Sequence, residues 1–225
     1  MTGLFVTSTG TEIGKTHVTA ALAHLARSAG RSLRVVKPLV SGFDPAAPEG
    51  SDPAVLAAAA GLALDRATLD RISPWRYRAP LSPDMAAARE GTAIDFAALT
   101  EFCRAALAGP EDCVLVEGVG GVMVPLDGQH TVRDWIAALG IPAVLVAGSY
   151  LGTLSHTLTA RLALDAAGIP LQAIVLSESE TAPVTLAETV AALRRFIPDT
   201  PIIALPRRPG AESWRAAPEL SALLC

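Results

Sequence analysis

The stretch Thr7-Ser-Thr-Gly-Thr-Glu-Ile-Gly-Lys-Thr16 follows an apolar run, Leu4–Ser8, and leads into an Ala/Leu-rich segment, Lys15–Ala29. A strand, a glycine-bearing turn and a helix that opens with Gly-Lys-Thr form the context of a phosphate-binding loop. Backbone N–H groups at such a helix start attract an anion, and glycine lets the backbone approach it closely. The common spacing needs a glycine where Thr9 stands, and the glycine is Gly10 instead. A helix N-terminus that happens to read Gly-Lys-Thr is the alternative.

Lysine usage adds weight to this loop. The chain has only two lysines, Lys15 and Lys37, against sixteen arginines, and each lysine lies just beyond a strand-like run. A guanidinium is a planar fork and replaces the point charge of an ammonium poorly. Both lysines are therefore candidates for binding compact anions, although a composition bias that left Lys37 by chance is the alternative.

Apolar runs rich in β-branched residues alternate with Ala/Leu-rich stretches along the chain. The predicted strands are Leu4–Ser8, Leu33–Val36, Val114–Glu117, Ala143–Ala147, Ala173–Leu176 and Ile202–Leu205, with a short extra strand at Val122–Val124. The predicted helices are Lys15–Ala29, Pro53–Ala60, Asp95–Leu107, Val132–Leu139, Thr153–Ala167 and Pro183–Phe196. Strands that are apolar throughout are typical of sheets buried on both faces. The order predicts an α/β fold of the P-loop NTPase type: one domain, residues 1–225, with a mostly parallel sheet and helices on both faces.

Two proline-rich stretches, residues 38–53 and 73–85, interrupt the alternation and are predicted as loops. Long loops inside compact domains are often functional. The tail from Pro206 to Cys225 is rich in proline and arginine and is predicted to end in a short apolar helix.

Composition excludes several classes of protein. A net charge of −4 and a pI of about 5.6 predict neither a nucleic-acid partner nor an anionic-membrane partner. No apolar stretch has the length of a membrane span, and the first apolar run is too short for a signal peptide. Three irregularly spaced cysteines match neither a disulfide framework nor a zinc site. We therefore expect a soluble cytoplasmic protein with reduced thiols.

Two carboxylates are candidates for a magnesium site. Glu117 ends a predicted strand and precedes Gly118-Val-Gly-Gly121, at the sheet edge where ligands of open α/β sheets collect. In a phosphate loop of this kind, Lys15 reaches the β- and γ-phosphates and the Thr16 hydroxyl ligates Mg²⁺. The alternative for Glu117 is a surface residue at a strand end. Asp52, taken alone, is better interpreted as the N-cap of the next helix.

Taken together, five segments resemble dethiobiotin synthetase. They are Thr9–Thr16, Lys37-Pro-Leu-Val-Ser-Gly42, Ser51-Asp52, Val116-Glu-Gly-Val-Gly-Gly121 and Leu151-Gly152. The resemblance spans most of the chain and implies ATP-dependent ring closure of 7,8-diaminononanoate with CO₂ in biotin biosynthesis. It implies a carbamate, then a phosphorylated carbamate, with ADP and phosphate released. It also implies a homodimer whose substrate lies across the subunit interface.

The resemblance assigns roles to residues of this chain. Lys15 and Lys37 would be catalytic, with Lys37 stabilising the carbamate and its phosphorylated form. Thr16, Asp52 and Glu117 would share Mg²⁺. Ser41, Gly152 and Thr153 would bind the substrate, whose carboxylate meets backbone N–H groups at the start of a helix. The nucleotide would contact Glu12, Ile13, Gly14, Lys15, Thr16, His17, Asp52, Glu117, Gly118, Val119, Gly120, Ser177, Pro206, Arg207 and Arg208.

Four places depart from the family pattern. Ser8 stands where the family usually has glycine, and Ser177 where an asparagine often reads the adenine. Asp84 stands where histidine is frequent, and Pro206-Arg207-Arg208 is more charged than usual. These departures leave the nucleotide preference and the substrate pose open, while the phosphate chemistry is unaffected.

Three other functions compete with this interpretation. A chromosome-partition or septum-placement ATPase shares the fold, but its signature lysine early in the loop is replaced here by Gly10. An amidoligase of the cobyrinic-acid type would need a glutaminase domain, for which this chain has no room. A stand-alone kinase acting on another small acid is the third alternative.

Overall fold

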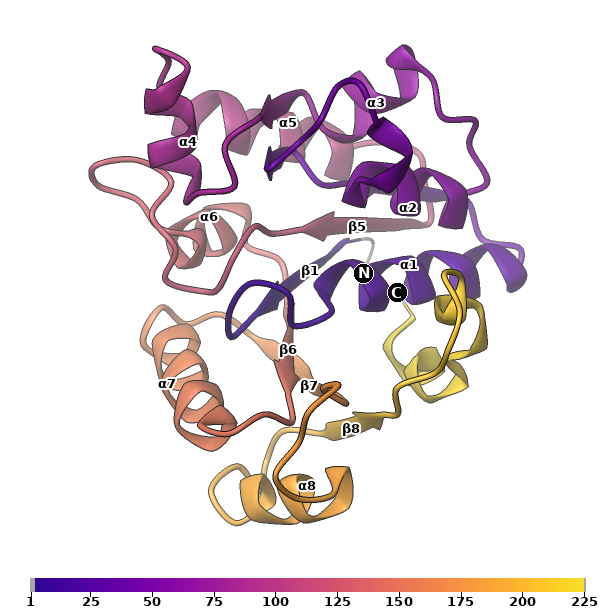
Figure 1. Cartoon of the computed structure of the whole chain (residues 1–225), viewed down its shortest axis with the longest axis vertical. Coiled ribbons are helices and arrows are strands. Elements are labelled where there is room, and N and C mark those ends of the chain that lie inside the picture. Colours follow the sequence, from indigo (N-terminus) through magenta and orange to yellow (C-terminus); the bar gives the residue numbers. More distant parts are fainter. Residues whose placement is uncertain (1–2, 225) are drawn as a thin grey trace.

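The computed structural model describes residues 3–224, which form a six-stranded sheet and a small two-stranded sheet (Figure 1). The large sheet has the order β2-β5-β1-β6-β7-β8, and all its strand pairs are parallel. Its strands are β1 Gly3–Ser8, β2 Leu33–Val36, β5 Cys113–Glu117, β6 Ala143–Gly148, β7 Leu171–Ser177 and β8 Ile202–Leu205. The small sheet pairs β3 Leu39–Ser41 with β4 Trp75–Tyr77.

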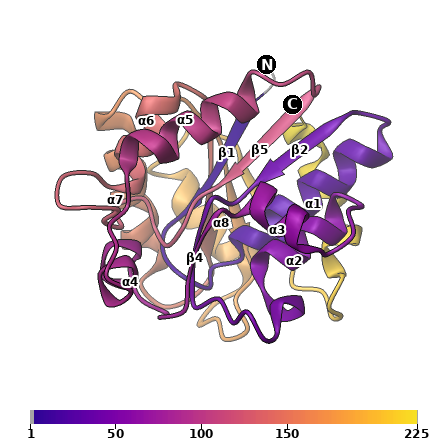
Figure 2. The same ribbon diagram turned by 90° about the horizontal axis from the view of Figure 1, so that it is seen from above.

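Helices cover both faces of the large sheet. The α-helices are α1 Lys15–Ser28, α2 Asp52–Ala59, α3 Arg66–Ile72, α4 Pro83–Arg89, α5 Phe96–Leu107, α6 Val132–Leu139, α7 Thr153–Ala166 and α8 Leu186–Arg194. Figure 2 shows α5 and α6 on one side of β1, β5 and β2, with α1, α2 and α3 on the other. Short 3₁₀ helices are η1 Pro48–Gly50, η2 Ser213–Ala216 and η3 Pro218–Leu223.

Alternation along β1 divides the core into two clusters. Leu4 and Val6 join α1 and the C-terminal 3₁₀ helices, where Trp214 is buried. Phe5 points to the opposite face and packs edge-on against Trp135 of α6, with ring centroids 5.0 Å apart. Because successive residues of a strand face opposite sides, a strand apolar throughout serves both clusters. The predicted α/β fold with helices on both faces is confirmed.

Six predicted strands and six predicted helices are confirmed, with shifts at some of their ends. The extra strand predicted at Val122–Val124 is wrong, because this segment turns back on itself: the Val124 N–H donates to the Gly121 carbonyl at 3.1 Å. Helix α8 starts at Leu186 rather than at Pro183 as predicted. Thr185 and Glu188 form a capping box at this start. The tail contains η2 and η3, and Cys225 lies outside the described residues.

The two proline-rich stretches are more ordered than predicted. Residues 38–53 contain β3, η1 and the start of α2, and residues 73–85 contain β4 and the start of α4. The Lys37 N–H donates to the Ile72 carbonyl at 2.9 Å, and the Trp75 N–H donates to the Pro38 carbonyl at 3.1 Å. These bonds hold the two stretches side by side beyond the end of β2. Within residues 3–224, no helix combines the length and the apolar character that crossing a bilayer requires.

The Phe5–Trp135 contact predicts a large stability effect. Trp135 is fully buried, so Trp135→Ala removes a large side chain from a packed site and is expected to cost about 3–5 kcal/mol of unfolding free energy. Urea denaturation measures this loss. Phe196→Ala is the control, because Phe196 is 65% exposed, and it should change stability little; equal effects would contradict the packing account.

Candidate functional site

The phosphate-loop candidate lies between the end of β1 and the start of α1. Gly14 has φ 98°, a left-handed conformation that glycine adopts freely. Glu12 has φ 59° and is the one non-glycine residue with positive φ among residues 3–224. Such backbone strain clusters at functional sites. Nothing in the sequence signalled it, because glutamate has no preference for this conformation.

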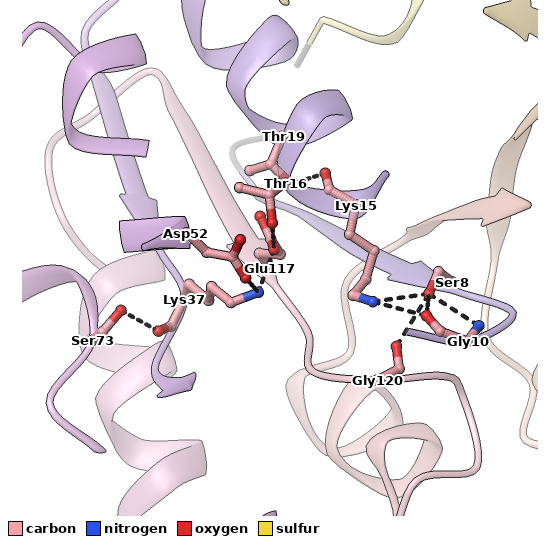
Figure 3. A network of polar contacts seen from close by, with 10 residues as sticks. All are labelled: Ser8, Gly10, Lys15, Thr16, Thr19, Lys37, Asp52, Ser73, Glu117 and Gly120. Atoms are coloured by element: carbon pink, nitrogen blue, oxygen red, sulfur yellow. Dashed lines mark hydrogen bonds and ion pairs between the residues drawn. The ribbon is translucent and has the colours of Figure 1, made fainter. Parts of the chain in front are cut away.

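Lys15 is buried and lies across the loop that precedes it (Figure 3). Its ammonium donates to the Ser8 hydroxyl and to the Gly10 carbonyl, each at 3.0 Å. Burial, and then the nearby Lys37 ammonium, lowers the pKa of Lys15 to about 8. An anion bound beside this ammonium would favour its charged form.

Ser8 connects three segments of the site. Its hydroxyl lies 2.5 Å from the Gly10 carbonyl and 3.1 Å from the Gly120 carbonyl, to either of which it can donate. It also accepts a hydrogen bond from the Gly10 N–H at 3.2 Å. The residue that departs from the family pattern therefore joins the phosphate loop to the loop that follows β5, and it holds Lys15 in position.

We expect Ser8→Ala to weaken both stability and nucleotide binding. The change leaves the Gly10 N–H and one donor of Lys15 without an acceptor, which costs about 1–3 kcal/mol for buried groups. Urea denaturation and ATP titration calorimetry measure the two effects. Ser28→Ala, at an exposed position at the end of α1, is the control. Wild-type stability and affinity in Ser8→Ala would show that the network is dispensable.

A second polar cluster surrounds Lys37, immediately after β2. Its ammonium lies 2.5 Å from Glu117 Oε1 and 2.9 Å from Asp52 Oδ2, and its side chain is only 5% exposed. The Thr16 hydroxyl donates to the same Glu117 Oε1 at 2.6 Å. Three residues predicted to share a metal ion therefore lie together around one lysine (Figure 3).

Charge pairing sets the protonation of this cluster. Burial opposes the charge on Lys37, but the carboxylates of Glu117 and Asp52 outweigh it and raise the pKa of Lys37. Burial likewise opposes ionisation of Asp52, and the Lys37 ammonium outweighs it and lowers the pKa of Asp52. The N-cap of α2 is Ser51, and Asp52 is the first residue of the helix. The N-cap interpretation of Asp52 is therefore wrong, and its partner is Lys37.

The oxygen atoms of this cluster fit a magnesium ion. Glu117 is fully buried, and its Oε2 has no hydrogen-bond partner among residues 3–224. In the same part of the chain, no group of three or more His, Cys, Asp or Glu side chains forms a metal site. A cation here would be held by Thr16, Asp52 and Glu117 and would keep several waters or phosphate oxygens, as Mg²⁺ prefers.

Two cavities meet at Gly14. The first, of about 720 Å³, contains both lysines. It is lined by Thr11, Glu12, Gly14, Lys15, Thr16, Lys37, Val40, Ser41, Gly42, Asp52, Pro80, Leu81, Ser82, Pro83, Val119, Gly120 and Val124. The wall formed by residues Pro80 to Pro83 was not among the predicted site residues. The proline-rich stretch that contains it was predicted as a loop of the kind that is often functional.

The second cavity, of about 740 Å³, extends from Gly14 to the C-terminal segment. It is lined by Gly14, His17, Ser177, Glu178, Ser179, Glu180, Leu205, Pro206, Arg207, Arg208, Pro209, Gly210 and Ser213. Burial, and then the Arg208 charge, lowers the pKa of His17. The Arg207 N–H donates to Glu178 Oε2 at 2.9 Å, so an acidic residue that sequence reasoning missed orders this wall.

Several predicted site residues line neither cavity. Ile13 packs against the core, and the Gly118 N–H donates to the Val6 carbonyl at 2.9 Å. Gly152, with φ 98°, and Thr153 begin α7, where the Thr153 hydroxyl donates to the Gly148 carbonyl at 2.5 Å. The structure therefore does not bring the start of α7 into either cavity of this chain.

Comparisons with known proteins point to one family. A family model described as an AAA domain matches residues 2–213. The ATP-dependent dethiobiotin synthetase BioD of Acidiphilium cryptum is 50% identical over 202 residues, covering 89% of this chain and 91% of the relative. The protein of the same name from a Caulobacter species, strain K31, is 50% identical over 218 residues, covering 96% and 91%. The resemblance in sequence motifs is confirmed.

One solved structure shows the fold alone. The cell division ATPase MinD of Pyrococcus furiosus superposes with a TM-score of 0.53 at 18% identity, covering 98% of this chain and 90% of that protein. At this identity the likeness supports the parallel-sheet architecture and carries no argument about activity.

Proposed function

The chain belongs to the ATP-dependent dethiobiotin synthetase family, and we therefore propose that it closes the ring of dethiobiotin from 7,8-diaminononanoate, CO₂ and ATP. The observation that carries this proposal is the junction of two cavities at Gly14, with Lys15 and Lys37 both in the cavity that would hold the diamine. A nucleotide in the second cavity would direct its phosphates past the start of α1 toward these two ammonium groups.

The reaction consists of three bond-forming steps. One amine of the substrate attacks CO₂ and loses a proton, which gives a carbamate. A carbamate oxygen attacks the γ-phosphorus, and ADP leaves. The second amine then attacks the carbamate carbon and loses a proton, the bond from that carbon to the phosphorylated oxygen breaks, and phosphate leaves with that oxygen. The product is a cyclic urea.

The two lysines supply what this chemistry needs. Catalysis of phosphoryl transfer is mostly positioning and charge neutralisation. Lys15 lies across the phosphate loop and would hold the β- and γ-phosphates. Lys37 lines the same cavity and would stabilise the carbamate and its phosphorylated form. A carbamate and a triphosphate repel each other, and two buried ammonium groups between them offset that repulsion.

Magnesium would be held by Thr16, Asp52 and Glu117. When bound, the ion would neutralise charge on the β- and γ-phosphate oxygens. Among residues 3–224 the buried Oε2 of Glu117 has no hydrogen-bond partner, which supports this role, because a buried polar oxygen without a partner is costly.

The second cavity would hold the base of the nucleotide. It is lined by Ser177, Pro206, Arg207 and Arg208, and by His17 of α1. Ser177 replaces an asparagine that often reads adenine in the family, so we infer a relaxed nucleotide preference. Turnover with ATP, CTP and GTP tests this inference; strict dependence on ATP would contradict it.

A homodimer would complete the diamine site. Gly152 and Thr153 line neither cavity of their own chain, and their neighbourhood carries exposed apolar side chains: Leu151 is 85% exposed and Leu162 is 69% exposed. Ser41 would contact the diamine from within the first cavity. Sedimentation equilibrium tests the dimer, and a monomer at micromolar concentration would contradict it.

Product analysis tests the proposed reaction. The protein is incubated with 7,8-diaminononanoate, ¹³C-bicarbonate, Mg²⁺ and ATP, and the products are identified by mass spectrometry. We expect labelled dethiobiotin only when all four are present. ADP release without that product would instead favour a partition-type ATPase or another small-molecule kinase.

A further inference from the structure

The three proposed metal ligands are not free in this structure, because they are bound to one another and to Lys37. We propose that Lys37 and the divalent cation compete for the same two carboxylates, so that metal binding releases Lys37 into the first cavity. This inference rests on the proposed function of the site and adds an order to it: the lysine that serves the substrate becomes available when the metal is bound.

Distances place the ammonium in the position of a counter-cation. Lys37 Nζ lies 2.5 Å from Glu117 Oε1 and 2.9 Å from Asp52 Oδ2. Thr16 donates its hydroxyl hydrogen to the same Glu117 oxygen at 2.6 Å. One oxygen of each carboxylate therefore already contacts the ammonium, and Glu117 is fully buried.

Charge accounting favours an exchange. The Lys37 ammonium faces two carboxylates, the fully buried Glu117 and the half-exposed Asp52, so the three groups together keep one negative charge. A divalent cation neutralises both carboxylates, and a buried ammonium beside a neutral cluster then needs another anion. The first cavity, which Lys37 also lines, is where the carbamate and the γ-phosphate would meet.

The backbone of Lys37 is held in place by hydrogen bonds, and the residue lines the first cavity. The Ser73 hydroxyl donates to the Lys37 carbonyl at 2.5 Å, and the Lys37 N–H donates to the Ile72 carbonyl at 2.9 Å. A lysine carries its charge on a flexible four-carbon stem. A shift between carboxylates and substrate therefore requires a change of side-chain rotamer alone.

Metal affinity in the absence of nucleotide and substrate tests the competition. Free Mn²⁺ is counted by electron paramagnetic resonance while it is titrated into the protein. Lys37→Met removes the competing charge and leaves the carboxylates without their ammonium partner. We therefore expect this variant to bind Mn²⁺ at least about tenfold more tightly than wild type. Lys37→Arg keeps the charge and should resemble wild type. Equal affinities in Lys37→Met and wild type would overturn the proposal.

A second measurement uses the unaltered protein, because Lys37→Met could fail to fold. Only two lysines occur in the chain, so ¹⁵N-labelling of lysine side chains gives two ammonium signals, assigned with Lys15→Met. A buried, ion-paired ammonium exchanges its protons slowly with water. Adding ADP alone should preserve slow exchange of the Lys37 ammonium, and adding Mg²⁺ with ADP should accelerate it. Slow exchange that persists with Mg²⁺ bound would overturn the proposal.

Neither measurement depends on turnover. A protein that shows the competition but makes no dethiobiotin would contradict the proposed reaction and leave the competition standing. A protein that makes dethiobiotin but shows no competition between Lys37 and the metal would support the proposed reaction and overturn the competition.

Discussion

Lys37→Arg is expected to lower turnover about 10²–10³-fold, the loss typical of removing one charge-stabilising group from a transition state. The substituted guanidinium keeps its positive charge, so Asp52 and Glu117 remain paired and ATP binding should be preserved. Turnover falls because a planar fork cannot place a point charge between a carbamate and a γ-phosphate. Dethiobiotin formation and ATP titration calorimetry measure the two quantities on the same protein.

The chain supplies its own contrast for this variant. Lys15 contacts Ser8 and Gly10 of the phosphate loop rather than the two carboxylates. Lys15→Arg should therefore weaken ATP binding itself, whereas Lys37→Arg should not. Unchanged turnover in Lys37→Arg would contradict the role assigned to this lysine.

Glu117→Gln is expected to raise the Mg²⁺ concentration needed for half-maximal turnover by about tenfold or more, because a ligand charge is lost where a hard cation binds oxygen. The amide keeps the volume of the side chain, so packing at this fully buried position is retained. Turnover measured across a Mg²⁺ titration tests the expectation. Glu101→Gln, on the exposed side of α5, is the matched control. If Glu117→Gln gave the same Mg²⁺ titration curve as wild type, Glu117 would not bind the metal and would serve only as the residue that ends β5.

The large sheet could be predicted from sequence because its strands are apolar throughout. Each of the six was placed within two residues at either end, since β-branched runs between Ala/Leu-rich stretches leave few alternatives. The small sheet could not be predicted. Leu39–Ser41 and Trp75–Tyr77 are three residues each, and both follow a proline. Their pairing depends on a contact between segments far apart in the chain.

Sequence motifs predicted the two lysines and the three oxygen ligands beside them, but not their contacts. Strand pairing explains why: Val36 lies opposite Val116, so Lys37, the first residue after β2, lies beside Glu117, the last residue of β5. Sequence alone does not give the neighbour of β2, and so it could not reveal this ion pair. The interpretation of Asp52 as an N-cap failed for the same reason, because its partner, Lys37, lies in a distant segment just beyond the end of β2. The assigned roles of these residues stay predictions.

In the proposed reaction, a carbamate oxygen attacks the γ-phosphate between Lys15 and Lys37. The most direct test follows the oxygen atoms of ¹⁸O-labelled bicarbonate during a reaction that is short compared with its exchange with water. The account predicts one ¹⁸O atom in the released phosphate and one in the urea carbonyl of dethiobiotin. Unlabelled phosphate formed together with labelled dethiobiotin would contradict it, because the carbamate would then have lost its oxygen by another route.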